Sequence, residues 1–476
     1  MNLPPIPPIP PPARTPRPIG KSIRDSALFR LGVIGVLVLV LLIPLSRVKE
    51  LVSERLHRAD GAKKEIASIW GGRQEIGGPV IVVPYRVRYT DAKGIARELE
   101  QKARFLPDSL KISGKLLPEL RHRGLFETVV YRLQLHVEAS FPPPDFGAWS
   151  IPPEDVRWEK AALGVGVPDL RGIRGDATLR WDGRTVPFAG GSADPRMWGS
   201  GLTAAIPLAP PAPGATEHAV SFDLGLQGSD DLRFLPFGRE TVVDLESAWS
   251  SPSFTGAFLP EQRTTSEKGF TARWRISWLG RSYPQQWRDP EFSSADRVEE
   301  GGVTASDAIQ QAVCGSAFGV GLYLPADSYQ KTERSLKYAI LFVVLTFATF
   351  FLYELLAPVE LHPVQYLLVG AAICLFYLLL LSISEQAPFP LAYAISSAAI
   401  VVLISGYSAA ILRGRLRALV LGGLLGLLYG YLYVLLQAED QALLLGSVGL
   451  FAILGTLMYL TRRIDWGKGG MEGAAS

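Results

Sequence analysis

The sequence predicts a polytopic α-helical membrane protein of six spans, with a large mainly-β periplasmic domain inserted between spans 1 and 2. The first observation is the uneven placement of apolar runs, one at 27–45 and five more between 338 and 460. The second is that the block 46–337 lacks the run of roughly 20 apolar residues that crosses a hydrocarbon core. The third is that short alternating segments, punctuated by proline and glycine, fill this block. This layout excludes a soluble enzyme.

The amino-acid composition argues against nucleic-acid binding, a disulfide and a metal site. The chain has 476 residues, of which 20% are charged, and a formal net charge of +3. No basic run interleaved with aromatic residues indicates nucleic-acid binding. Of the two cysteines, Cys314 lies in the long block and Cys374 in an apolar run, so we expect no disulfide between them. Neither has histidine partners at ligand spacing, so we expect no metal site, and no motif indicates a cofactor.

The N-terminal segment 1–26 is predicted to be a cytoplasmic tail. Residues 4–12 are almost entirely proline and isoleucine, which favours polyproline II and a disordered tail over a docking peptide. The apolar run 27–45 is longer than a signal-peptide core. It is followed by Arg47, Lys49 and Glu50 rather than by small residues, so we interpret it as an uncleaved anchor.

Loop charges predict the orientation of the spans. Basic residues precede the first span, separate the fourth from the fifth and follow the sixth, whereas the opposite short loops carry only acidic charge. The positive-inside rule then places both termini, including the tail 461–476, in the cytoplasm, and the block 46–337 in the periplasm of a bacterium with an inner membrane. The loop at Glu360 is an exception, because it is predicted to be cytoplasmic and has no basic residue. The predicted spans are 27–45, 338–357, 363–383, 391–412, 417–437 and 441–460.

The periplasmic block has the patterns of β-strands. Alternating segments predict strands that pack as sandwich-like sheets, and only 49–69 has a helical pattern, which would extend the first membrane helix. Asp182-Gly183 separates two short alternating runs and is a favoured two-residue hairpin turn. The predicted strand segments are 80–89, 128–141, 178–188, 218–226 and 270–278.

No arrangement in this block indicates catalysis. The sequence has no His-Glu-x-x-His motif, nucleophile elbow, phosphate loop or paired Cys-x-x-Cys. Four histidines are scattered, and we interpret them as surface or packed residues rather than as ligands. We therefore expect no catalytic residue here. These histidines are His57, His122, His136 and His218.

The five C-terminal spans form a predicted bundle, 338–460. Gly422, Gly426 and Gly430 recur every four residues, which favours close helix packing over a permeation path. Ionisable groups are costly in a membrane, and here they lie at span ends, where snorkelling to water is the simplest interpretation. A sharper hypothesis is an ion-pair set that holds the periplasmic domain on the bundle. The predicted outer-face set is Arg334, Lys337, Glu385, Glu439 and Asp440, and the inner-face set is Glu354, Glu360, His362 and Gln365.

Several motifs resemble the CreD family of inner-membrane proteins. The long block contains RGLFE at 123–127, PSFTG at 252–256 and FLP at 258–260, and the bundle contains RSLKY at 334–338 and LHPVQYLLVG at 361–370. The resemblance covers about 43–466. Two positions depart from the family pattern, because Gln386 stands where a histidine is expected and Gly467 where a tyrosine is expected. Further matching motifs are FYLLLLS at 376–382, ALLLGS at 442–447 and IDW at 464–466.

The resemblance implies a non-enzymatic role in cell-envelope integrity, within a stress response under a two-component regulon. It supplies no catalytic residues and no cofactor. The alternative is a transporter or lipid-handling protein that passes an envelope component between the bundle and the periplasmic domain. The implied partners are the lipid bilayer, envelope lipids, or periplasmic and inner-membrane proteins. An intramembrane enzyme ranks third, because the bundle offers few convergent polar side chains.

Overall fold

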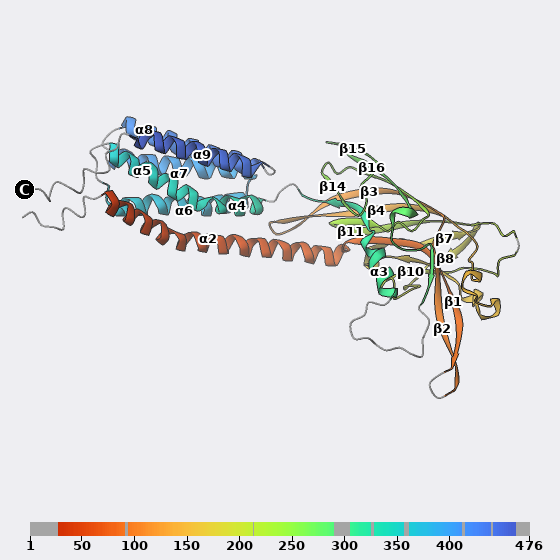
Figure 1. The fold of residues 1–476 in the computed structure, drawn as a ribbon. Helices are drawn as coiled ribbons and strands as arrows, with labels where there is room; N and C mark the ends of the chain where they lie inside the picture. The colour runs from red at the N-terminus through yellow and green to blue at the C-terminus, as the bar shows by residue number, and fades with distance from the viewer. Residues whose placement is uncertain are drawn as a thin grey trace, which may run out of the picture. The chain divides into compact units, whose positions relative to one another are not determined.

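The computed structural model describes residues 27–90, 94–212, 214–289, 305–324, 328–356, 361–411, 415–438 and 441–462. Contacts divide the chain into two compact units (Figure 1). A helical unit comprises Met1–Arg58 with Ala326–Ser476, and a β-rich unit comprises Ala59–Pro325. The proline-rich segment 1–26, Glu360, Glu439, Asp440 and the tail after residue 462 lie outside the described residues.

Each predicted span falls on a helix, but not every helix has the length and apolarity of a span. In the described residues, four helices pass that test, or five if the pair α4 and α5, bent by 48°, is one span. The last helix counts only as a shorter apolar segment, Ala442–Thr456. The helices of this unit are α2 (Ala27–Trp70), α4 (Ser328–Lys337), α5 (Ala339–Leu356), α6 (Pro363–Ser384), α7 (Phe389–Ile411), α8 (Arg415–Gln437) and α9 (Ala442–Thr461).

Helix α2 is continuous over 44 residues, so the predicted helical segment 49–69 does extend the first apolar run. Leu41 of α2 is buried, and it lies over Gly370 of α6. A Cβ at Gly370 would collide with the Leu41 side chain and come within 3.0 Å of Phe347. The glycine therefore lets α2 pack against α6.

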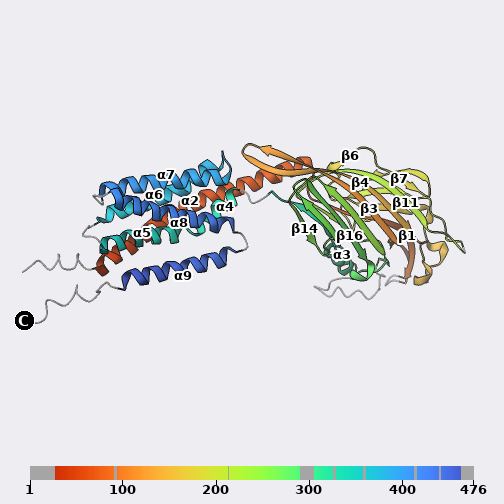
Figure 2. The ribbon, with the colours of Figure 1, turned by 90° about the horizontal axis from the view of Figure 1, so that it is seen from above.

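The β-rich unit contains two nine-stranded sheets, which Figure 2 shows from above. Their inward side chains form one core, as predicted for a sandwich-like arrangement. The first sheet contains β1 (Gln74–Thr90), β2 (Ala96–Phe105), β5 (Ala162–Gly166), β9 (Ala189–Gly190), β10 (Gly201–Ala205), β12 (Asp231–Phe234), β14 (Pro252–Gly256), β17 (Gln286–Arg288) and β18 (Phe318–Leu322). The second contains β3 (Ser109–Arg123), β4 (Phe126–Phe141), β6 (Ile173–Arg174), β7 (Thr178–Trp181), β8 (Arg184–Pro187), β11 (His218–Ser229), β13 (Glu240–Ser247), β15 (Gln262–Ser266) and β16 (Gly269–Ser277).

Strand alternation builds the second sheet. In β4, Leu133 and Leu135 point into the core, whereas Gln134 and His136, which alternate with them, are exposed. The predicted hairpin is also present, because β7 pairs with β8 across Asp182 and Gly183, whose φ angles are 48° and 79°. Both angles are positive, as a type I′ turn requires. Because the polar side chains alternate with the buried ones, they make the outer face of this sheet polar.

The expectation of a single helical segment in the β-rich block is wrong. Helix α3 (Ala305–Gly315) lies in this unit, and its Val313 is buried in the core. Ile309 and Ala312 also pack against that core. The spacing of these three residues is that of an amphipathic helix face, but the segment is short and follows a run of polar residues.

Candidate functional site

One polar cluster lies at an end of the helical unit, around Glu354 of α5. Its side chain is 5% exposed and accepts hydrogen bonds from Arg30 Nη1 of α2 at 2.7 Å and from the Tyr366 hydroxyl of α6 at 3.0 Å. The Leu361 amide donates to the same carboxylate at 3.3 Å. The buried carboxylate is thus held by donors from three parts of the fold, as a charge in a low-dielectric site requires.

His362 and Gln365, which the sequence placed in the same cluster as Glu354, form a capping box at the start of α6. His362 Nδ1 accepts from the Val364 amide at 3.3 Å, and Gln365 Oε1 accepts from the His362 amide at 3.0 Å. Both side chains therefore satisfy amides of the first helical turn, which is a structural task. The sequence predicted neither Arg30 nor Tyr366 as a partner of Glu354, because the basic residues near the first span were interpreted only as topology charges.

A second polar cluster surrounds Glu385, at the C-terminal end of α6. The carboxylate accepts from the Tyr329 hydroxyl at 3.4 Å and lies 3.5 Å from Arg55 Nε of α2. Arg334 and Lys337 lie in the last turn of α4. Their predicted pairing with acidic residues of this end stays a prediction. The sequence did not predict the contact of Arg55 with Glu385. Arg55 reaches this cluster because α2 continues beyond its apolar run.

The three glycines of α8, Gly422, Gly426 and Gly430, which we call the glycine stripe, differ in how closely other residues approach them. A Cβ at Gly422 would collide with the Ser405 hydroxyl of α7, so the two helices approach closely there. At Gly426 and Gly430, an added Cβ would meet nothing within 4 Å. The described part of the chain therefore shows close packing at one glycine and open space at the other two.

The histidines of the β-rich unit lie in surface pairs. His136 Nδ1 is 2.8 Å from Asp223 Oδ1, and His218 Nδ1 is 2.7 Å from Asp182 Oδ2. The hydrogen bond that His136 donates to Asp223 raises the pKa of His136, and Glu138 adds to the effect. The described residues contain no group of three His, Cys, Asp or Glu side chains that could hold a metal ion.

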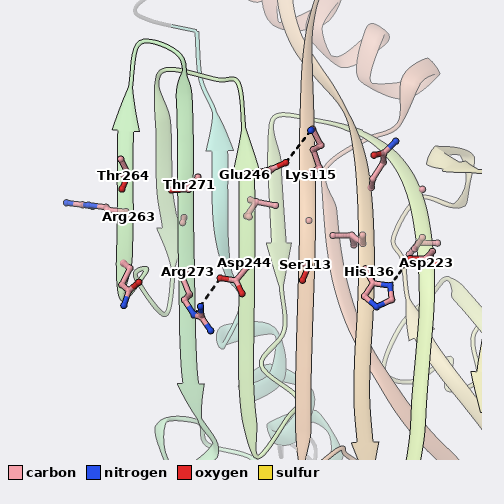
Figure 3. Close-up of a pocket in the computed structure, with 18 of the residues that line it drawn as sticks. Ser113, Lys115, His136, Asp223, Asp244, Glu246, Arg263, Thr264, Thr271 and Arg273 are labelled. Carbon is pink, nitrogen blue, oxygen red and sulfur yellow. Dashed lines mark hydrogen bonds and ion pairs between the residues drawn. The ribbon is translucent and has the colours of Figure 1, made fainter. Parts of the chain in front are cut away.

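The outer face of the second sheet carries a hollow of about 900 Å³ (Figure 3). We call it the sheet trough, and it extends over β15, β16, β13, β3, β4 and β11. Lys115 lies 3.3 Å from Glu246, and Arg273 lies 3.6 Å from Asp244. Such cross-strand pairs are typical of a solvated sheet face. The trough can hydrogen-bond a hydrophilic molecule, but its described lining contains no nucleophile held by a base and an orienting partner.

Comparisons with known proteins identify the family. Residues 26–467 match the family model described as inner membrane protein CreD. The chain is 33% identical over 432 residues to inner membrane protein CreD of Escherichia coli (strain K12), covering 90% of this chain and 91% of that protein. The family that the sequence motifs resemble is thereby confirmed.

Solved structures resemble the chain only weakly. A mutant M1 zinc metallopeptidase from Deinococcus radiodurans is 11% identical with a TM-score of 0.22, covering 36% of this chain and 38% of that chain. An M1 zinc metallopeptidase from the same organism is 12% identical with a TM-score of 0.20, again covering 36% of this chain and 38% of that chain. Similarity this low carries no argument about fold or activity, whereas the match to the family model spans most of the sequence. The chain belongs to the CreD family of inner membrane proteins.

Proposed function

We propose that this protein is a non-enzymatic inner-membrane protein that supports cell-envelope integrity in a stress response. Its β-rich unit is the working part, and α2 holds that unit on the membrane. The membrane character of the family and the apolar helices support the location. This role belongs to a stress response under a two-component regulon.

The proposed topology has six spans, with both termini in the cytoplasm and the domain 46–337 in the periplasm between spans 1 and 2. Clusters of basic residues on the loops assigned to the cytoplasm support it. Reporter enzymes that are active only outside the cytoplasm test it. Fusions within 46–337 should be active, and fusions after residue 462 should be inactive. Activity at the C-terminal fusion would contradict the topology.

We call this non-enzymatic role the scaffold proposal. The observation that carries it is the binding of the C-terminal end of α2 to the β-rich unit. Arg121 lies over the Trp70 ring at 4.5 Å, and the Trp70 indole donates to the Tyr131 carbonyl at 3.3 Å. Glu65, also on α2, lies 2.6 Å from Arg123 of β3. An apolar run and a segment bound to β3 and β4 thus belong to one unbroken helix.

The experiment is complementation of a strain that lacks the protein. Envelope integrity is measured as uptake of a membrane-impermeant dye after β-lactam or detergent stress. Trp70→Ala should restore integrity less well than the wild type at equal protein level. Trp278→Ala is the matched control, because Arg239 also lies over its ring, at 5.4 Å, away from α2. The proposal fails if loss of the whole protein leaves dye uptake unchanged under stress.

The alternative function is a transporter or lipid-handling protein. A hollow of about 910 Å³ between α5, α8 and α9, lined mainly by apolar side chains, favours some lipid contact in the helical unit. The sheet trough is charged and does not suit an acyl chain. Crosslinking of the β-rich unit in cells, with lipids and proteins both identified, separates the two functions. Captured lipid would favour lipid handling, and captured protein would favour the scaffold.

A further inference from the structure

The side chains of the sheet trough stand in two rows across the second sheet (Figure 3). Strand register puts one residue from each of six neighbouring strands, β15 to β11, into a row. The second row lies two residues away on each strand, at a distance of about 7 Å. With about 4.8 Å between strands, each row is about 24 Å long. The first row is Gln262, Arg273, Asp244, Ser113, His136 and Asp223.

Ion pairs within the rows cancel most of the charge of the trough. Lys115 lies 3.3 Å from Glu246, and Arg273 lies 3.6 Å from Asp244. A third pair joins His136 to a neighbouring aspartate. The other two charged residues of the lining are an arginine and an aspartate, which have opposite signs. A surface without a large net charge attracts neither a polyanion nor a polycation, so we expect a neutral ligand.

Most of the other positions in the two rows are neutral side chains that can hydrogen-bond. Their hydroxyl and amide groups both donate and accept. All of them are exposed, and none has a side-chain hydrogen-bond partner among the described residues. The leucines of the lining are almost fully buried, so the trough has no apolar patch for an acyl chain or for the apolar face of a helix. These neutral residues are Ser113, Gln134, Gln262, Thr264 and Thr271.

The pairing of the strands decides between a peptide and a glycan. An extended peptide binds a sheet by pairing its main-chain amides with a free strand edge. The strands from β16 to β11 are each paired on both sides, so the middle of the trough has no free edge. A peptide lying there would leave most of its amides without a backbone partner. A neutral glycan has no such requirement, and its hydroxyl groups match a surface on which donors stand beside acceptors.

We propose that the sheet trough binds a linear, neutral glycan chain. Its hydroxyl groups hydrogen-bond to the neutral side chains of both rows and to the outer atoms of the ion pairs. The length of the rows suits several sugar units rather than a single one. This inference adds a ligand to the β-rich unit and does not rest on the envelope role, because binding to the purified protein is independent of dye uptake by cells.

The test uses the full-length protein in phosphatidylcholine nanodiscs, because glycosidic detergents have sugar head groups that would compete. Isothermal titration calorimetry measures the Kd of disaccharides and hexasaccharides of β-1,4-linked glucose, β-1,4-linked N-acetylglucosamine and α-1,4-linked glucose. We expect at least one hexasaccharide to bind, to bind more tightly than its disaccharide, and to keep its affinity at high salt.

Polygalacturonate is the anionic comparison. Binding of polygalacturonate alone, with an affinity that falls as salt rises, would overturn the proposal, because it would show that the ligand is recognised by charge. A failure of all three neutral series to bind would overturn it as well.

Three variants locate the binding site. Ser113→Ile puts an apolar side chain in the middle of the first row and should weaken binding by about tenfold, because glycan hydroxyl groups would be buried against it without partners. Thr264→Val removes one hydroxyl from the second row and should weaken binding by about threefold. Thr265→Val is the matched control, because Thr265 is the next exposed residue of β15 and does not line the trough.

Melting temperatures guard against misfolding. All three positions are exposed, and valine and isoleucine suit β-strands, so each variant should melt at or above the wild-type temperature. Equal affinity of the glycan for Ser113→Ile, Thr264→Val and Thr265→Val would place its binding site elsewhere and overturn the proposal.

Discussion

Arg30 Nη1 in α2 lies 2.7 Å from Glu354 Oε1 in α5, although 324 positions separate the two residues in the sequence. The carboxylate is almost fully buried, and the Tyr366 hydroxyl satisfies its second oxygen. The pair therefore joins the first apolar helix to the C-terminal helices, within the helical unit. Burial makes the pair sensitive to loss of either partner.

Removal of Glu354 should destabilise the helical unit. Glu354→Ala removes the carboxylate that accepts from Arg30 and Tyr366, and we expect a loss of about 1–2 kcal/mol in the free energy of unfolding. Arg30→Ala should lose a similar amount, and the double variant should lose less than the sum. Reversible unfolding in mixed micelles measures this. Strict additivity would show that the two side chains do not interact.

Packing of α2 on α6 gives a second prediction. Gly370→Ala should destabilise the protein by about 1–3 kcal/mol, because the new methyl group meets Leu41 and Phe347. The control Gly406→Ala, with nothing within 4 Å of the new Cβ, should be neutral or stabilising by about 0.5–1 kcal/mol. Leu41→Ala in the Gly370→Ala background should recover stability. Melting temperatures measured in detergent rank the stabilities of these variants.

Local patterns made much of the fold predictable. The alternation in β4 and the Asp182-Gly183 turn are read within a few residues, and both are present. Parallel pairing of β1 with β12 and of β3 with β13 was not predictable, because it joins segments that are far apart in sequence. The alternation of apolar residues within one segment does not indicate which distant strand pairs with it. Helix α3 was missed because its single short amphipathic face resembles other polar loops.

The polar clusters show the same limit. Glu354 could be selected because a carboxylate near a span is costly without a partner. Arg30 could not be selected as that partner, because a basic residue at the N-terminal end of the first span equally indicates a topology charge. Arg55 was missed for a similar reason, since it lies on a helix extension whose face is set by packing. Partner choice depends on helix arrangement, which the sequence of one span does not contain.

His136 gives a pH-dependent prediction. Its pKa is raised above 6.5 by the hydrogen bond to Asp223, so the folded state binds this proton more tightly than the unfolded state. The stabilisation is therefore fully present below the unfolded pKa and is lost as pH rises through the folded pKa. The side chain is largely exposed, so the effect should stay below about 0.5 kcal/mol. Imidazole NMR should show a higher pKa in the wild type than in Asp223→Asn, and equal values would refute the pairing.

Buried tyrosine hydroxyls in the bundle lead to a prediction about the sign of a stability change. Among the described residues, the hydroxyls of Tyr377 and Tyr429 are buried without a hydrogen-bond partner, and both rings pack on Phe376. Removal of an unpartnered buried hydroxyl relieves a desolvation penalty, so Tyr377→Phe should raise stability by about 1 kcal/mol. Tyr393→Phe is the matched control, because its hydroxyl donates to the Tyr429 carbonyl and its loss should lower stability by about 1 kcal/mol.

The same measurement in nanodiscs and in detergent extends this test. If Tyr377→Phe lowers the melting temperature as much as Tyr393→Phe in both media, the hydroxyl has a partner such as an ordered water, and the prediction is wrong. If it does so only in nanodiscs, the partner is lipid, because the medium is the only difference. A rise in both media is the expected result. The hydroxyl then weakens the bundle, and its retention needs a role other than stability.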